Sequence, residues 1–341
     1  MASPLSDTRS HFISDAIVSS GAVSRSDAGA GIKPDKYRCY QNKKNFISLT
    51  TKKATRLDKD NKHPFSGENV FFATKHSKEK VLAPLLEKLG LKCILADVDT
   101  DMFGTFSGEV DRVGGVRETL RRKTSAVAQT NPAARFVLAS EGSFGPHPFI
   151  GFVQSDHEAL LFVDRKLNTE IYVEEISTET NHAEIEFGPS DDLHAFLKQI
   201  GFPEHGIIVK LKDRSDMVFK NLQTFQSVEQ AIIDGFLVST DSKVILSTDM
   251  RANFNPTRMK VIEKVGLKLI ETLNSLCPDC KTPGFAISKG VPGLPCEECG
   301  EPSRISKDVL WSCVKCAHSE QKARPDGVVA ISAADCEFCN P

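Results

Sequence analysis

Eight of the ten cysteines in this 341-residue chain form four Cys-x-x-Cys pairs near the C-terminus. The pairs are Cys277 and Cys280, Cys296 and Cys299, Cys313 and Cys316, and Cys336 and Cys339. Two intervening residues let one tight turn aim both thiolates at a single ion, and two such turns complete a tetrahedral zinc site. The spacing therefore predicts two structural zinc ions, with an iron–sulfur cluster or redox-active thiols as the alternative. Since four thiolates leave no coordination position for water, neither ion is expected to be a reaction centre.

The order of the pairs leaves the ligand sets open. The segment CEECG, followed thirteen residues after Cys299 by Cys-Val-Lys-Cys, resembles a zinc ribbon, in which two turns at the ends of a hairpin face each other. That pattern favours the two middle pairs on one ion and the two outer pairs on the other. Sequential pairing, with the first two pairs on one ion and the last two on the other, is the alternative.

A second group of residues could bind an anion. The apolar run NVFFAT is followed by KHSKEK and then by a helical pattern, which places Lys75, His76, Lys78 and Lys80 around a helix N-terminus. Backbone amides and the helix dipole attract anions at that end of a helix, and lysines add positive charge. Near residue 256, Arg251, Arg258 and Lys260 surround another predicted helix start, where an anionic ligand would offset their repulsion by the dipole.

An acidic residue follows the apolar strand pattern Phe136–Ala139. Glu141 stands in the segment ASEGSFGPHP, which we expect to turn sharply at Gly142 and Gly145. This position predicts a carboxylate at the carboxyl edge of the sheet, where open α/β folds bind ligands. A carboxylate there could bind Mg²⁺ or activate water.

These residues are carried by alternating strand and helix patterns between residues 69 and 275, which are typical of an α/β domain. We predict strands at 70–73, 93–96, 136–139, 206–211 and 244–246, a hairpin of 159–164 and 170–176, and helices at 81–89, 116–128, after Asp192, at 226–238 and from Thr257 to about Ser275. The predicted domains are a disordered leader at 1–65, an α/β domain at 66–275 and a double zinc-binding module at 276–341.

Charge and composition limit the classes of function. Residues 1–65 hold 12 Lys or Arg, 6 Asp and no Glu, whereas the remainder carries 31 basic and 39 acidic residues. An acidic folded part argues against nucleic acid as the ligand. No apolar run approaches the roughly 20 residues of a membrane helix, so we expect a soluble intracellular protein. The acid-poor leader is similar to a plastid or mitochondrial transit peptide, and without such targeting the protein would be cytoplasmic.

Taken together, the motifs resemble the inosine triphosphate pyrophosphatase superfamily. The segment ATKHSKEKV is similar to its phosphate-binding S/T-x-N-x-x-K loop, with Thr74 matching, His76 in the Asn place and Lys80 as the lysine after one inserted residue. RETLRRKT aligns Glu118 with the family's metal-binding Glu and Lys123 with its lysine. The resemblance implies a mixed sheet with flanking helices over 69–275, with a small zinc-ribbon module after it.

Three further segments extend this resemblance. Glu141 matches the second Asp of the family's A-D-D-S-G-L turn, while Ser140 replaces the first, so one acid of that pair is missing. GFPEHG is similar to the base-binding loop, with Phe202 placed to stack on a base and His205 in the place of its Asp. PTRMKV resembles S-H-R-x-K-A and supplies Arg258 and Lys260. With its four-pair tail, the whole of 69–341 is similar to an uncharacterised family of bacterial and organellar proteins without an established activity.

Two hypotheses follow. The first is a magnesium-dependent hydrolase of the pyrophosphatase type acting on a nucleotide or another phosphorylated small molecule. In it, Lys75, Lys80 and Arg258 neutralise phosphates, and Glu118 and Glu141 hold Mg²⁺. The second is a non-catalytic anion- or nucleotide-binding protein whose zinc module docks a protein partner. The missing acid and the His at position 205 favour the second.

Overall fold

The computed structural model describes residues 62–104, 114–148, 150–212 and 214–341. Nearly all of the predicted leader lies outside the described residues. Residues 62–65 belong to the folded part, since Phe65 is buried and packs on Phe136 with ring centroids 4.5 Å apart. The buried His63 forms a 3.0 Å hydrogen bond to the Leu273 carbonyl. The fold therefore begins before residue 66.

The first sheet is mixed, with strand order β2-β1-β3-β4-β5. Its strands are β1 (Asn69–Ala73), β2 (Lys92–Leu95), β3 (Phe136–Pro146), β4 (Gln154–Asp164) and β5 (Thr169–Ser177). Strands β2, β1 and β3 run parallel, and β3, β4 and β5 are antiparallel neighbours. The predicted mixed α/β architecture and the 159–176 hairpin are confirmed.

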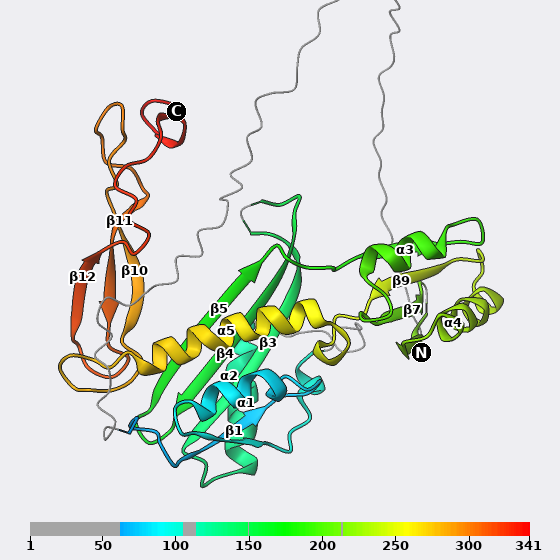
Figure 1. The fold of residues 1–341 in the computed structure, drawn as a ribbon, viewed down its shortest axis with the longest axis horizontal. Coiled ribbons are helices and arrows are strands. Elements are labelled where there is room, and N and C mark those ends of the chain that lie inside the picture. The colour runs from blue at the N-terminus through cyan, green and yellow to red at the C-terminus, as the bar shows by residue number, and fades with distance from the viewer. Residues whose placement is uncertain (1–61, 105–113, 149, 213) are drawn as a thin grey trace, which may run out of the picture. The chain divides into compact units, whose positions relative to one another are not determined.

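Helices cover both faces of this sheet (Figure 1). On one face, α1 (Glu79–Glu87) and α5 (Pro256–Asn274) pack over a core that contains Phe72, Leu138 and Phe162. On the other, α2 (Val116–Thr130) packs over a smaller core that contains Leu120 and Val137. Successive side chains of a strand point to opposite faces of the sheet, so the apolar residues of each strand contribute alternately to the two cores.

A second sheet follows β5 in the chain and is entirely antiparallel, with order β6-β9-β7-β8. Its strands are β6 (Glu184–Phe187), β7 (Ile207–Leu211), β8 (Arg214–Leu222) and β9 (Val244–Thr248), and α3 (Leu193–Ile200) and α4 (Phe225–Val238) accompany it. Their apolar side chains form a third core. The sequence patterns predict β7, β9 and both helices, but not β6 or β8, so this separate sheet is a finding of the structure.

The C-terminal part contains a three-stranded antiparallel sheet, β10 (Ala286–Pro292), β11 (Ser306–Ser312) and β12 (Ser319–Ala323). Short 3₁₀ helices occur at Thr100–Phe103 (η1), Ala252–Phe254 (η2) and Ala333–Asp335 (η3). The described residues contain five α-helices in all. None of the helices within the described residues is long and apolar enough to cross a membrane.

Candidate functional site

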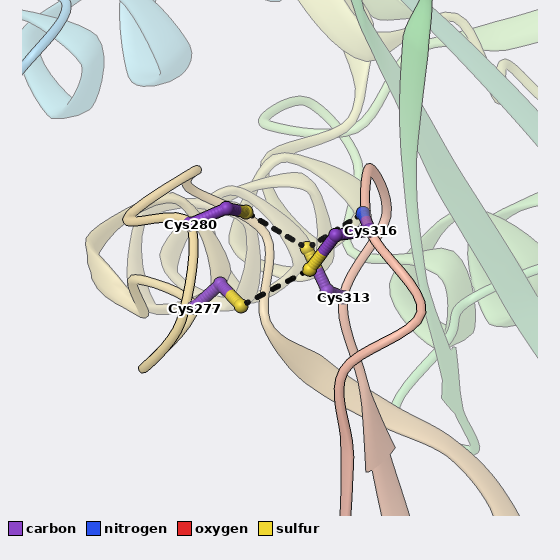
Figure 2. A group of neighbouring side chains, drawn as sticks. All are labelled: Cys277, Cys280, Cys313 and Cys316. Carbon is purple, nitrogen blue, oxygen red and sulfur yellow. Dashed lines mark hydrogen bonds between the residues drawn. The ribbon is translucent and has the colours of Figure 1, made fainter.

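The eight paired cysteines gather into two clusters of four, and within each cluster the sulfur atoms all lie within 4.8 Å of one another. One cluster contains Cys277, Cys280, Cys313 and Cys316 (Figure 2), and the other contains Cys296, Cys299, Cys336 and Cys339. Two sulfur–sulfur distances are 3.7 and 3.6 Å in the first cluster and 3.8 and 3.7 Å in the second. A zinc tetrahedron with bonds of about 2.3 Å has edges of about 3.8 Å. Each cluster can therefore hold a metal ion, with a geometry consistent with zinc.

Both pairings expected from the sequence are wrong, because strands separate the turns that they combine. The turn at Cys296–Cys299 precedes β11 and the turn at Cys313–Cys316 follows it. A strand of that length spans about 20 Å, far beyond the reach of one ion. The register Ala286 to Ser312 instead places the turn before β10 beside the turn after β11. At the opposite end of these strands, a β-bridge between Cys296 and Ile331 places the last Cys-x-x-Cys turn beside the turn at Cys296–Cys299. The ligand sets therefore alternate along the chain.

A polar cavity of about 100 Å³ lies where the parallel strands β1 and β2 end. Five cationic side chains and two carboxylates line it, together with a histidine and small polar residues. They are Thr74, Lys75, His76 and Lys78 after β1, Thr100 and Asp101 after β2, Lys123 on α2, Ser140, Glu141 and Gly142 on β3, Lys220 on β8, and Arg251 after β9. We call this cavity the cationic pocket. Its cations outnumber its carboxylates, which favours an anionic ligand.

Glu141 reaches the pocket because β3 is longer than its parallel neighbour. Strand β1 ends at Ala73, which pairs with Ala139, and β3 then continues to Pro146 in register with β4. The segment SEGSFG is thus a strand, and the sharp turn expected at Gly142 and Gly145 is wrong. Glu141 is 5% exposed and forms an ion pair of 2.5 Å with the buried Lys123. The Lys123 ammonium group also donates to the Ser140 carbonyl at 3.2 Å.

The loop between β1 and α1 has an unusual backbone. His76 and Ser77 both have positive φ angles, 64° and 63°, which are uncommon for residues other than glycine. Lys78, at the N-cap of α1, returns to −63°. A change of sign between successive residues points neighbouring amides into one concavity, as in many anion sites. Burial lowers the pKa of His76 to about 4, so this side chain is neutral at pH 7.

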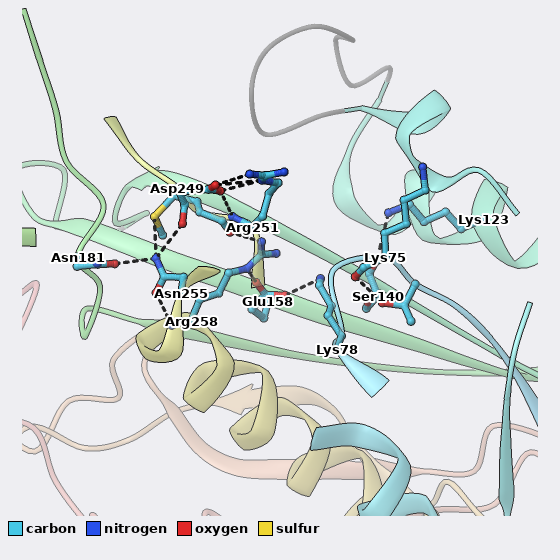
Figure 3. A network of polar contacts seen from close by, with 12 residues as sticks. Lys75, Lys78, Lys123, Ser140, Glu158, Asn181, Asp249, Arg251, Asn255 and Arg258 are labelled. Atoms are coloured by element: carbon cyan, nitrogen blue, oxygen red, sulfur yellow. Dashed lines mark hydrogen bonds and ion pairs between the residues drawn. The ribbon is translucent and has the colours of Figure 1, made fainter. Parts of the chain in front are cut away.

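A buried ion-pair network stands behind the pocket wall (Figure 3). Glu158 on β4 accepts from the Arg258 Nε at 2.6 Å and from the Lys78 Nζ at 3.4 Å. All three side chains are at most 6% exposed. Burial lowers the pKa of Lys78 to about 8. Burial alone would raise the pKa of Glu158, but the charges of Arg258 and Lys78 outweigh it and the pKa is lowered.

Gly142 gives this network its space. It lies opposite Glu158 in the β3–β4 register, and a Cβ atom at this position would collide with the side chains of Arg258 and Glu158. Because Gly142 has no side chain, the buried Arg258–Glu158 ion pair can lie directly against strand β3.

The connection from β9 to α5 adds Arg251 to the pocket. The fully buried Asp249 accepts from the Arg251 Nε at 2.9 and 3.1 Å and from its Nη2 at 2.5 Å, and Arg251 also donates to Asn221 at 3.0 Å. Asn255 caps α5 by accepting from the Arg258 amide at 2.9 Å and donates to Asn181 at the same distance (Figure 3). The bonds from Arg251 to Asp249 and Asn221 hold its guanidinium group in a fixed orientation.

Five of the predicted site residues line the cationic pocket, namely Thr74, Lys75, His76, Lys123 and Glu141. Lys75 is ion-paired with Asp99 at 2.5 Å and with Asp101 at 2.8 Å, so the loops after β1 and β2 are tied together. Arg258 does not line the pocket and is buried behind it.

Five others lie elsewhere. Glu118 lines a different surface cleft beside α2, and its half-exposed side chain pairs with Arg122 at 2.5 Å. Lys80 and Lys260 are exposed. Phe202 packs against the core of the second sheet, and the His205 Nε2 is 2.9 Å from the Thr257 hydroxyl. The structure therefore does not bring the proposed base-binding residues Phe202 and His205 to the pocket.

The remaining pocket residues were not assigned as site residues from the sequence. The sequence places the basic residues Lys78 and Arg251 at helix starts, but whether Lys78 or Lys80 reaches the pocket depends on the backbone of the loop before α1. Lys220 carries no sequence signal, because its strand β8 was not predicted. The helical periodicity of the sequence alone predicts that Glu118 and Lys123 point to different sides of their helix. Five residues turn a helix by about 500°, so the two side chains lie about 140° apart around its axis.

Comparison with known proteins bears on the C-terminal two thirds of the chain. A family model described as Domain of unknown function (DUF6671) matches residues 125–341. The chain belongs to this family. The DUF6671 match includes the part of α2 after Lys123, the strands β3 to β5, the second sheet and both cysteine clusters.

No curated protein matches the chain. One solved structure that it resembles is a nucleoside-triphosphatase / dITP/XTP pyrophosphatase from Mycobacterium abscessus, with 12% identity over 32% of this chain and 71% of that chain and a TM-score of 0.22. Membership of DUF6671 assigns no activity.

Proposed function

We propose that the cationic pocket binds the phosphate groups of a nucleotide or another phosphorylated small molecule, and that the protein is a magnesium-dependent hydrolase of the pyrophosphatase type. The observation that carries the proposal is the convergence of five cationic side chains at the carboxyl ends of two parallel strands. Ligands bind at this edge in open α/β sheets. The cavity, about 100 Å³, suits phosphate groups better than an entire nucleotide, since pockets for larger ligands measure about 300–1,000 Å³.

Burial of the cations strengthens this proposal. Lys78 and Lys123 are 5% and 8% exposed. A charge held away from water attracts a phosphate more strongly than a surface lysine does. Lys78, Lys123 and Arg251 would bind and orient the phosphates and neutralise negative charge that develops on them.

The oxygen donors of the pocket fit Mg²⁺, which prefers carboxylate and phosphate oxygens. Glu141 and Asp101 would hold the ion with the phosphates of the ligand, so Asp101 replaces Glu118 as the second proposed carboxylate ligand. When bound, Mg²⁺ neutralises phosphate charge and activates water. We further propose that the two cysteine clusters hold structural zinc.

The alternative is a non-catalytic anion- or nucleotide-binding protein whose zinc module docks a protein partner. The ion pairs of the two pocket carboxylates favour it. Glu141 is 2.5 Å from the Lys123 ammonium group, and Asp101 is 2.8 Å from that of Lys75. A carboxylate neutralised in this way is a weaker metal ligand and a weaker base.

Hydrolysis is tested with the full chain and a panel of canonical and deaminated nucleoside triphosphates, with and without Mg²⁺. We expect magnesium-dependent release of pyrophosphate, which Glu141→Gln lowers by at least about 100-fold, as for a lost catalytic carboxylate. The melting temperature and zinc content of the variant are measured as controls. Binding of a nucleotide without turnover, at high protein concentration with Mg²⁺ present, would support the non-catalytic alternative.

Phosphate binding has its own test in two lysines. Lys123 lines the pocket and Lys80 does not, so the matched variants Lys123→Met and Lys80→Met separate the two positions. We expect Lys123→Met to weaken pyrophosphate binding, measured by calorimetry, by about 10-fold or more, as for a lost charge-assisted hydrogen bond. Lys80→Met should bind as the wild type does. The opposite order would move the site to the outer face of α1.

A further inference from the structure

Asp156 on β4 is a buried carboxyl group. Its side chain is 1% exposed, and neither carboxylate oxygen has a partner among the residues that the structure describes. A carboxylate that is ionised, buried and unpaired costs several kcal/mol, so such a group retains its proton instead. Burial and the nearby charge of Glu158 raise the pKa of Asp156 to about 8, in agreement with its surroundings.

The position of Asp156 connects it to the cationic pocket. It lies two residues before Glu158 on the same strand, so both side chains point to the same face of the sheet. Glu158 holds Lys78, which lines the pocket, and Arg258, which lies behind it. If Asp156 were ionised, two carboxylates would balance the two cations. With a neutral Asp156, the group keeps one surplus positive charge.

We propose that Asp156 is a positioning residue that remains protonated in the folded protein and thereby leaves a surplus positive charge on the Lys78–Glu158–Arg258 network at the wall of the cationic pocket. The role in anion binding rests on the proposed function, whereas the protonation state does not.

Charged and uncharged groups from several elements surround Asp156. Glu158 comes from its own strand, Arg258 from α5 and Lys78 from the loop before α1, and all three act on it electrostatically. The adjacent strands place the uncharged Phe144 and Ser177 opposite it. One step away on β5, Glu175 is ion-paired with Lys268, and His182 stacks on Phe144 with ring centroids 5.7 Å apart.

The first test measures unfolding of the zinc-loaded full chain against pH for the wild type and Asp156→Asn. The folded pKa, about 8, lies above the unfolded value, about 3.9, so the folded state holds one extra proton between them. The stabilising effect of that proton is complete below pH 4 and is lost as the pH rises to 8. Relative to Asp156→Asn, the wild-type unfolding equilibrium constant should therefore rise about tenfold per pH unit, or about 100-fold from pH 5 to pH 7.

This pH range isolates Asp156. Lys78 keeps its proton there in both states, and His182 is present in both proteins, so its contribution cancels in the comparison. Asp241→Asn, which changes an exposed aspartate, is the matched control and should not reproduce the rise. Identical pH dependence in the wild type and Asp156→Asn would overturn the proposal. Carbon-13 NMR of labelled aspartate in the wild type gives a second measurement, since one carboxyl group should titrate near pH 8.

The second test measures pyrophosphate binding at pH 6.5. A neutral Asp156 predicts that Asp156→Asn binds within about twofold of the wild type, because the substitution changes no charge. Tighter binding by the variant, threefold or more, would show that a carboxylate had been removed and would overturn the proposal. If neither protein binds pyrophosphate, the link to the pocket fails with the proposed function, and the unfolding series still decides the protonation state.

Discussion

Variants that remove two Cys-x-x-Cys pairs are expected to lose one zinc ion or two, depending on which pairs are combined. Serine replacements at Cys277, Cys280, Cys313 and Cys316 affect a single cluster, so this quadruple variant should retain about one zinc ion of two. Replacing the first two pairs in the chain, at Cys277, Cys280, Cys296 and Cys299, removes half of each cluster and should leave no tightly bound zinc. Zinc content per chain is measured by mass spectrometry.

The physical reason is that zinc binding and folding are linked in such small modules, where a structural zinc contributes about 10–16 kcal/mol at pH 7. Strands β10 and β11 each connect the first cluster with the second. Loss of either ion should therefore also expose the tail to proteolysis. Cys93→Ser, a cysteine outside both clusters, is the control and should keep both ions. If the variant that lacks the first two pairs kept one ion, the pairing would be sequential and the alternating ligand sets would be refuted.

Arg258→Met is expected to destabilise the α/β part strongly. Arg258 is 1% exposed, donates to Glu158 at 2.6 Å and also donates to the Met250 carbonyl. Its guanidinium group lies 5.1 Å from the centre of the Phe144 ring. Removing one partner of a buried ion pair leaves the other charge uncompensated and costs about 3–5 kcal/mol. Denaturant unfolding of the full chain measures this loss.

Lys260→Met, on the same helix but exposed, is the matched control and should change the free energy of unfolding by less than about 0.5 kcal/mol. Adding Glu158→Gln to Arg258→Met removes the orphaned carboxylate and should recover part of the loss. A single Arg258→Met variant as stable as the wild type would mean that Arg258 acts on the ligand rather than on the fold. Pyrophosphate binding by the refolded variant then tests that role directly.

Much of the α/β part was predictable because local patterns determine it. Buried strands such as Val70–Ala73 appear as apolar runs, and α5 begins at an Asn cap followed by proline, a signal carried by adjacent residues. The antiparallel second sheet was not predictable as a unit, because β6 has no continuous apolar run, the apolar run of β8 is only three residues long (217–219), and both strands depend on pairing with β9 and β7. Likewise, SEGSFG reads as a turn from its glycines, yet pairing with β4 keeps it extended.

For the site, local sequence patterns predict which residues could carry chemistry: eight cysteines in turns that fit zinc, a carboxylate after a buried strand, and basic residues at two helix starts. Each of these signals lies within a few residues of chain. Which of these residues meet depends on the tertiary structure. Strand register places alternate cysteine pairs side by side. The loop with positive φ angles at His76 and Ser77 leads to the buried Lys78 at the pocket. The rotation of α2 directs Lys123 into the pocket and Glu118 away from it. Such choices depend on contacts between residues far apart in the chain, which local spacing does not specify.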